Sequence, residues 1–216
     1  MRDTCLLVVA VVAAAVATGS ADVAQRSFDQ DAIGNAPPGF TFAAARLRAA
    51  GRWVVRNDGS NRYVAHLAEG TPTEGFALAL LDVAPAADLR LSARVKAADG
   101  ARVGGLVWRY RNPENFYAVE LDLDAQEVAL YRVTRGNRIR LELEDDLELD
   151  RDAWHVLRVE HAGGRIRVAL GGIGIMRARA RDDAGADGRA GFWSAGNATT
   201  WFDDLSVQQA QPERDR

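Results

Sequence analysis

Apolar side chains recur at every second position in short segments that are separated by Gly, Pro, Asn and Asp. The clearest segment is 88–96, where Leu89, Leu91, Ala93 and Val95 alternate with charged and polar residues. A period of two is typical of a β-strand with one face on a core and the other toward solvent or ligand. Further strands are predicted at residues 63–67, 76–81, 104–110, 115–123, 127–133, 139–143, 154–160, 165–170, 190–194 and 200–207.

Glycines mark the turns between several of these segments. Gly163 and Gly164 separate the strands predicted at 154–160 and 165–170, and glycine readily adopts the positive φ that a tight hairpin needs. Only residues 42–50 favour a helix, because of their Ala, Leu and Arg content, and a loop is the alternative because clear caps are missing. Many short strands without a βαβ rhythm predict an all-β fold in which two antiparallel sheets pack face to face.

The two ends of the chain differ in composition from the middle. Residues 1–21 contain a short apolar run followed by small residues, which is typical of a secretory signal peptide. A membrane span needs about 20 apolar residues; a retained N-terminal anchor is the alternative interpretation. Residues 28–207 are predicted to form one domain, followed by a polar, disordered tail at 208–216. Cys5 is the only cysteine and lies in the leader, so the mature chain is expected to have no disulfide.

The charge balance limits the expected partners. The net charge is −3, and all basic residues except Lys96 are arginines, which indicates a composition bias. An isolated arginine therefore carries little functional information. We expect no broad basic field, and hence no nucleic-acid partner and no stable membrane insertion after signal cleavage. The mature protein is predicted to be an exported monomer, either periplasmic or extracellular.

Several short strings resemble a known group of bacterial proteins. They are Gly105-Leu106-Val107-Trp108-Arg109-Tyr110, Asn115-Phe116-Tyr117, Trp154-His155-Val156-Leu157-Arg158-Val159, Gly191-Phe192-Trp193 and Phe202-Asp203-Asp204-Leu205-Ser206-Val207. In this order the chain resembles secreted concanavalin A-like lectin/glucanase proteins, including the laminin-G-like and 3-keto-disaccharide hydrolase (domain of unknown function 1080) families. The resemblance covers nearly all of the mature chain. It implies a concanavalin A-like jelly-roll sandwich with glycans on the concave sheet face, but no particular activity.

A group of aromatic and polar residues is the first candidate site. Sugars present flat C–H faces and hydroxyl groups, so they are bound by aromatic rings beside Arg, Asn and acidic side chains. In a regular strand Trp108 and Arg109 point to opposite faces, so they do not both face one ligand. The alternative is that Trp108 and Tyr117 are core aromatics and that Arg109 is a solvated side chain. The predicted ligand contacts are Trp108, Arg109, Asn115, Tyr117, Glu120 and Trp193.

The segment Glu120-Leu121-Asp122-Leu123-Asp124 is the second candidate. It approximates the E-x-D-x-E signature of family 16 glucanases, in which one carboxylate attacks or stabilises and another protonates the leaving oxygen. This resemblance implies catalytic roles for Glu120 and Asp122. Two features oppose it. Asp124 is shorter than the glutamate expected there, and exposed acidic residues on a strand also keep a sheet soluble.

A calcium site is the third candidate. Asp29 lies near the start of the domain and Asp204 near its end. The first and last strands of a sandwich are commonly neighbours, and Ca²⁺ takes six to eight oxygen ligands from carboxylates and carbonyls. The alternative is that these aspartates cap turns. No cofactor is required for the predicted function, and calcium would be structural.

The sequence thus favours a secreted carbohydrate-binding, lectin-like sandwich with a glycan or oligosaccharide as its partner. A glycoside hydrolase, either family 16-like or 3-keto-disaccharide hydrolase-like, is the first alternative. A protein-interaction domain of the cell envelope is the second alternative.

Overall fold

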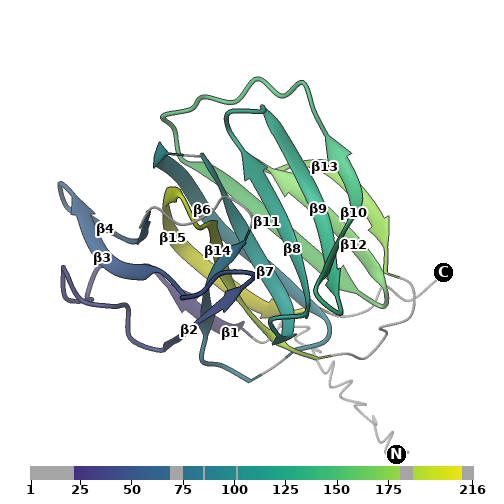
Figure 1. The fold of residues 1–216 in the computed structure, drawn as a ribbon, viewed down its shortest axis with the longest axis horizontal. Coiled ribbons are helices and arrows are strands. Elements are labelled where there is room, and N and C mark those ends of the chain that lie inside the picture. The colour runs from purple at the N-terminus through teal and green to yellow at the C-terminus, as the bar shows by residue number, and fades with distance from the viewer. Residues whose placement is uncertain (1–21, 69–74, 85, 101, 181–186, 211–216) are drawn as a thin grey trace, which may run out of the picture.

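The computed structural model describes residues 22–68, 75–84, 86–100, 102–180 and 187–210. Two antiparallel sheets lie face to face in a β-sandwich, as predicted (Figure 1). The predicted signal peptide at 1–21 and the tail residues 211–216 lie outside the described part of the chain. Within that part, no helix is long and apolar enough to cross a membrane.

The first sheet has seven strands in a row, with β1 (Asp22–Arg26) paired to β15 beside them. In spatial order these strands are β13 (Ile173–Arg179), β12 (Arg165–Leu170), β11 (His155–Ala162), β6 (Leu89–Gly100), β15 (Ala198–Gln209), β4 (Asn61–Leu67) and β3 (Arg52–Asp58). Because β1 lies before residue 28 and β15 continues to Gln209, the folded domain is longer at both ends than the predicted 28–207. The predicted tail therefore begins inside a strand.

The second sheet contains the remaining seven strands. In spatial order they are β10 (Asn137–Glu144), β9 (Glu127–Thr134), β8 (Asn115–Asp122), β7 (Val103–Asn112), β14 (Arg189–Ala195), β5 (Phe76–Leu81) and β2 (Phe40–Ala45). The predicted hairpin at Gly163 and Gly164 is present between β11 and β12, and both glycines have positive φ.

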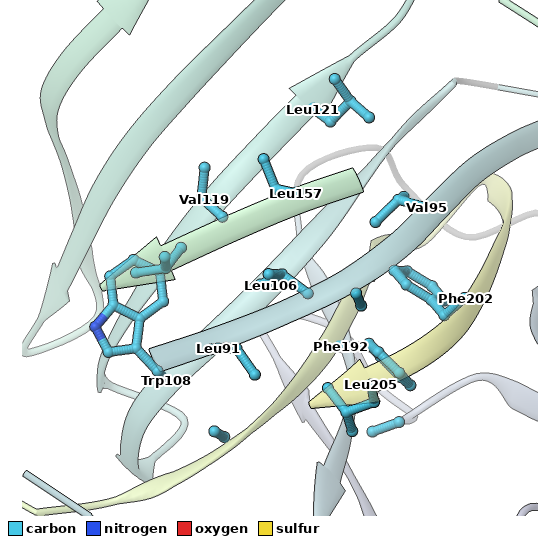
Figure 2. Close-up of a cluster of buried hydrophobic side chains, with 14 of the residues drawn as sticks. Leu91, Val95, Leu106, Trp108, Val119, Leu121, Leu157, Phe192, Phe202 and Leu205 are labelled. Atoms are coloured by element: carbon cyan, nitrogen blue, oxygen red, sulfur yellow. The ribbon is translucent and has the colours of Figure 1, made fainter. Parts of the chain in front are cut away.

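Apolar side chains from both sheets fill the space between them (Figure 2). The predicted alternation on β6 is confirmed, because Leu89, Leu91 and Val95 are 0–1% exposed. Phe202 of β15 stacks on Phe192 of β14 with 4.6 Å between ring centroids and thereby joins the two sheets. Such an aromatic pair contributes about 0.5–1.5 kcal/mol beyond its area burial.

The predicted helix at 42–50 is wrong. Residues Phe40–Ala45 form β2, which pairs with β5. Phe40 and Phe42 lie two positions apart and both pack against the central core, where Phe42 stacks near Trp53 at 6.3 Å. Burial of two aromatic rings on one strand face outweighs the helix propensity of the alanines, which amounts to fractions of a kcal/mol per residue.

Replacing Phe192 by Ala should lower the free energy of unfolding by about 3–5 kcal/mol, because the ring is fully buried and its removal leaves a cavity. Urea unfolding followed by tryptophan fluorescence measures this change. The control is Ile173→Ala, since Ile173 is 73% exposed, and its effect should stay within about 0.5 kcal/mol. Equal losses in the two variants would contradict this description of the core.

Candidate functional site

Two of the predicted ligand contacts belong to the core. Trp108 and Tyr117 are 0% and 3% exposed and stack on one another between the sheets, with ring centroids 5.8 Å apart. The Trp108 indole N–H donates to Nδ1 of His161, which comes from β11 of the facing sheet. A ring without exposed surface offers no platform to a sugar. The prediction of ligand contacts is therefore corrected for these two residues, and the core alternative is confirmed.

Arg109 and Asn115 have structural partners instead of an open position. Arg109 adopts a positive φ of 48° at an irregularity in the β7–β8 pairing, so the expected alternation with Trp108 is broken there. Its Nε–H donates to the carbonyl oxygen of Ala87 at 2.7 Å, and the side chain is 2% exposed. Asn115 accepts from the backbone N–H of Arg135 at 3.3 Å and thus ties adjacent turns together. The ligand contact predicted for Arg109 is corrected because this side chain is buried, whereas the contact predicted for Asn115 stays a prediction.

The outer face of the second sheet holds the other predicted residues. We call it the curved face. Phe76 of β5 and Phe116 of β8 are separated in the sheet by β14 and β7, yet their ring centroids are only 5.2 Å apart. Only a sheet that curls strongly toward this side brings them together. The curved face is formed by Phe76, Phe116, Glu120, Tyr131, Arg138 and Trp193.

Trp193 forms part of the floor of the curved face. Its indole N–H donates to the backbone carbonyl of Val119 at 2.9 Å, so the ring reaches across the intervening strand β7. Gly105 makes this possible: a Cβ there would lie 3.2 Å from the indole nitrogen and 2.0 Å from the Val119 carbonyl oxygen. Trp193 is 1% exposed, so it supports the face from below, and the prediction that its ring contacts the ligand is corrected.

The polar group of the curved face is an ion pair above an aromatic ring. Glu120 accepts hydrogen bonds from the guanidinium of Arg138 and from the Tyr131 hydroxyl, the latter at 3.4 Å. The Arg138 guanidinium carbon lies 3.6 Å from the centroid of the Tyr131 ring and 5.5 Å from that of Phe76. Burial raises the pKa of the Glu120 carboxyl, although Arg138 opposes this rise. The side chain of Arg138 is 32% exposed and is the part of this group most open to solvent.

Tyr131 and Arg138 were not predicted as site residues. They lie on β9 and β10, which Gly136 connects in a hairpin, and Arg138 pairs with Val133 one alternation step from Tyr131. The hairpin register alone places both side chains on one face, so this signal was present in the sequence. Arginine is so common in this chain that the position of Arg138 alone does not indicate a site.

Asp122 has a structural role in the turn that follows β8. Its Oδ1 accepts the backbone N–H groups of Asp124 and Ala125, each at 2.9 Å, and so caps the turn between β8 and β9. A carboxylate held by two N–H donors is fixed in a structural role. The predicted catalytic use of Glu120 and Asp122 stays a prediction.

The aspartates predicted to hold calcium already have donors as partners. Asp29 accepts the backbone N–H of Arg62 at 3.1 Å, and Asp204 forms an ion pair with Arg94 at 3.4 Å. In the described ranges no group of three or more His, Cys, Asp or Glu side chains is placed to hold a metal ion. Calcium at Asp29 and Asp204 stays a prediction, and a melting temperature that rises when calcium is added to chelator-treated protein would support it.

Comparisons with known proteins bear on the fold. No family profile and no curated protein matches the chain. Among solved structures, it is similar to the carbohydrate-binding module CBM66 from Bacillus subtilis (TM-score 0.62, 18% identity, 79% of this chain and 96% of that one). It is also similar to a Bacillus subtilis protein of unknown function with a galectin-like fold (0.60, 12%, 89% and 98%).

A third similar structure is domain 4 of AbnA, a GH43 extracellular arabinanase from Geobacillus stearothermophilus, in complex with arabinotriose (TM-score 0.57, 14% identity, 88% of this chain and 93% of that domain). At these identities the likeness establishes the fold alone. The chain is a β-sandwich of the galectin-like, jelly-roll kind, as the sequence predicted for the fold.

The buried His161 makes stability depend on pH. Burial, together with the positive charge of Arg109, lowers its pKa from 6.5 to about 3. The unfolded chain thus takes up a proton below pH 6.5 that the folded protein takes up only near pH 3, so stability should be lost as the pH falls through this window. The loss should reach about 1 kcal/mol per pH unit.

Chemical unfolding of the parent and of His161→Gln between pH 7 and pH 4 measures this effect. Glutamine keeps an acceptor for the Trp108 N–H but does not titrate. The raised pKa values of Glu120 and Asp203 affect both proteins and cancel in the difference. Parallel curves for the two proteins would show that His161 is not the source of the pH dependence.

Proposed function

We propose that this chain is an exported glycan-binding module that holds a saccharide on the curved face of its second sheet. The carrying observation is the Arg138–Glu120 ion pair above the ring of Tyr131. It combines guanidinium donors with a carboxylate acceptor, and the Tyr131 ring beneath the guanidinium supports it. Guanidinium and carboxylate groups are those that bind the hydroxyls of a sugar.

The burial of this group favours binding over solvation. Glu120 is 7% exposed and Tyr131 is 9% exposed, so these two side chains are largely shielded from water. Arg138, in contrast, reaches the surface. A guanidinium has five N–H donors, and neither one carboxylate nor a ring beneath it uses them all. A sugar diol approaching from solvent can therefore accept from Arg138 and donate to Glu120.

The fold supports the same proposal. One similar structure is a carbohydrate-binding module, and another is a domain of an extracellular arabinanase in complex with arabinotriose. Export rests on the predicted signal peptide at 1–21 and agrees with the extracellular origin of that domain. Membership of the 3-keto-disaccharide hydrolase group stays a prediction.

A glycoside hydrolase is the second candidate, favoured by the raised pKa of Glu120. A carboxyl that stays protonated to higher pH can act as a general acid toward a glycosidic oxygen. It is the weaker candidate because Asp122 caps a turn.

Replacing Glu120 by Gln should weaken glycan binding by about tenfold or more, because a charge-assisted hydrogen bond to the sugar is lost while the side chain keeps its size. A glycan array with the purified mature domain identifies the ligand, and titration calorimetry measures both proteins. The matched control is Asp31→Asn, another carboxylate paired with an arginine, which lies in the connection between β1 and β2 and outside the curved face.

An array that is blank for neutral and acidic glycans, or unchanged binding by Glu120→Gln, would refute the proposal. Release of reducing sugar by the parent but not by Glu120→Gln would identify the second candidate instead.

A further inference from the structure

The outer face of the first sheet gathers arginines at one end. Ile166, Val168 and Met176 point into the core, so the residues between them on β12 and β13 point outward. On these strands and the adjoining β11, five outward arginines accompany a single glutamate, Glu160. We call this the arginine face; it comprises Arg158, Arg165, Arg167, Arg177, Arg179 and Glu160.

The strand register places like charges directly opposite one another. Arg165 is the Cα partner of Arg179, and Arg167 is the Cα partner of Arg177. Like charges in such positions destabilise a sheet. Glu160 offsets part of this repulsion through ion pairs with Arg167 at 3.3 Å and with Arg90 at 3.0 Å. Among the residues that the structure describes, Arg177 and Arg179 have no acidic partner.

The arginine face is hollowed in two adjoining places. A cavity of about 500 Å³ is lined by Glu142, Arg165, Ile166, Arg167, Arg177, Ala178 and Arg179. A second cavity, of about 430 Å³, is lined by Arg90, Leu91, Ser92, Arg158, Glu160, Ser206 and Gln208. The first presents mainly guanidinium groups, and the second adds hydroxyl and amide groups. Charged residues on an edge strand can serve only to prevent β13 from pairing with another chain. That role does not require a hollowed surface.

Aromatic rings continue the same side of the sheet beyond the arginines. Arg94 of β6 lies 4.8 Å from the ring centroid of Trp154, and Tyr63 stacks on Trp201 at 4.6 Å. Trp154 and Trp201 are half-buried, so each keeps an exposed edge. Positive charge, neutral hydrogen-bonding groups and aromatic rings thus follow one another across neighbouring strands of the first sheet.

We infer that the arginine face is a second binding surface, separate from the curved face, and that its ligand is an acidic polysaccharide with carboxylates along its length. Arginine forks match planar carboxylates bidentately, and a chain of uronate residues supplies one carboxylate after another to the opposed arginine pairs. Binding would neutralise the repulsion across β12 and β13. The choice of a glycan among polyanions rests on the proposed function.

Polygalacturonate and its fully methyl-esterified form are the probes, because they differ only in charge. The intact mature protein should bind polygalacturonate and not the ester, with an affinity that falls steeply as salt is raised. The double variant Arg177→Gln/Arg179→Gln should bind about tenfold more weakly. Glu160→Gln should bind more tightly, since it removes the negative charge that β11 contributes to the face.

The control is Arg111→Gln/Arg135→Gln, which removes the same charge from exposed positions on the second sheet. Equal weakening in this control would show a response to net charge and overturn the inference. Equal binding of the methyl ester, or tighter binding of duplex DNA than of polygalacturonate, would also overturn it. Loss of polygalacturonate binding alone, with neutral glycan binding intact and sensitive to Glu120→Gln, refutes this inference without touching the proposed function.

Discussion

The second sheet has to bury large apolar side chains on both of its faces, and this constraint decides where a ligand can bind. Its inner face meets the first sheet through residues such as Leu106 and Val119, while Leu78 and Val107 are just as buried on its outer face. Each such side chain is worth about 1.5–3 kcal/mol when buried. Since nothing in the described part of the chain forms a third layer, the sheet covers these residues by curling on itself. The curl is what brings an arginine from β10 over a phenylalanine from β5.

The sequence was sufficient to predict the sandwich but not the orientation of individual strands. Alternation assigns residues to two faces without saying which face is the core, and β8 has large residues on both. Phe116 and Tyr117 are neighbouring aromatic residues, so the sequence does not say which of them points into the core. Tyr117 does, because its ring packs there against Trp108 and His161. Trp193 was predicted to contact the ligand, but its burial depends on the absent side chain of Gly105, which no periodicity reveals.

Irregular backbone accounts for the remaining differences from the predicted site. At Arg109 the left-handed backbone breaks the strict alternation of β7 and lets the guanidinium reach the carbonyl of Ala87, before the start of β6. The same neighbourhood holds the Trp108–His161 hydrogen bond between the sheets. These polar contacts fix how one sheet sits on the other at this end of the sandwich. Trp108 and Arg109, which were predicted to bind a ligand, therefore serve to position the two sheets relative to each other.

The distribution of charge shows why a whole-chain sum misleads. The net charge of −3 predicted no broad basic field, yet seven of the 30 acidic residues lie within 142–152, at the end of β10 and in the connection to β11. The arginines of β12 and β13 instead occupy every second position, and a two-glycine turn sets the register between β11 and β12. Alternation plus hairpin register would have predicted the arginine face from the sequence alone. A ligand meets one face of a few strands, so charge has to be counted by strand face before it is used to exclude a partner.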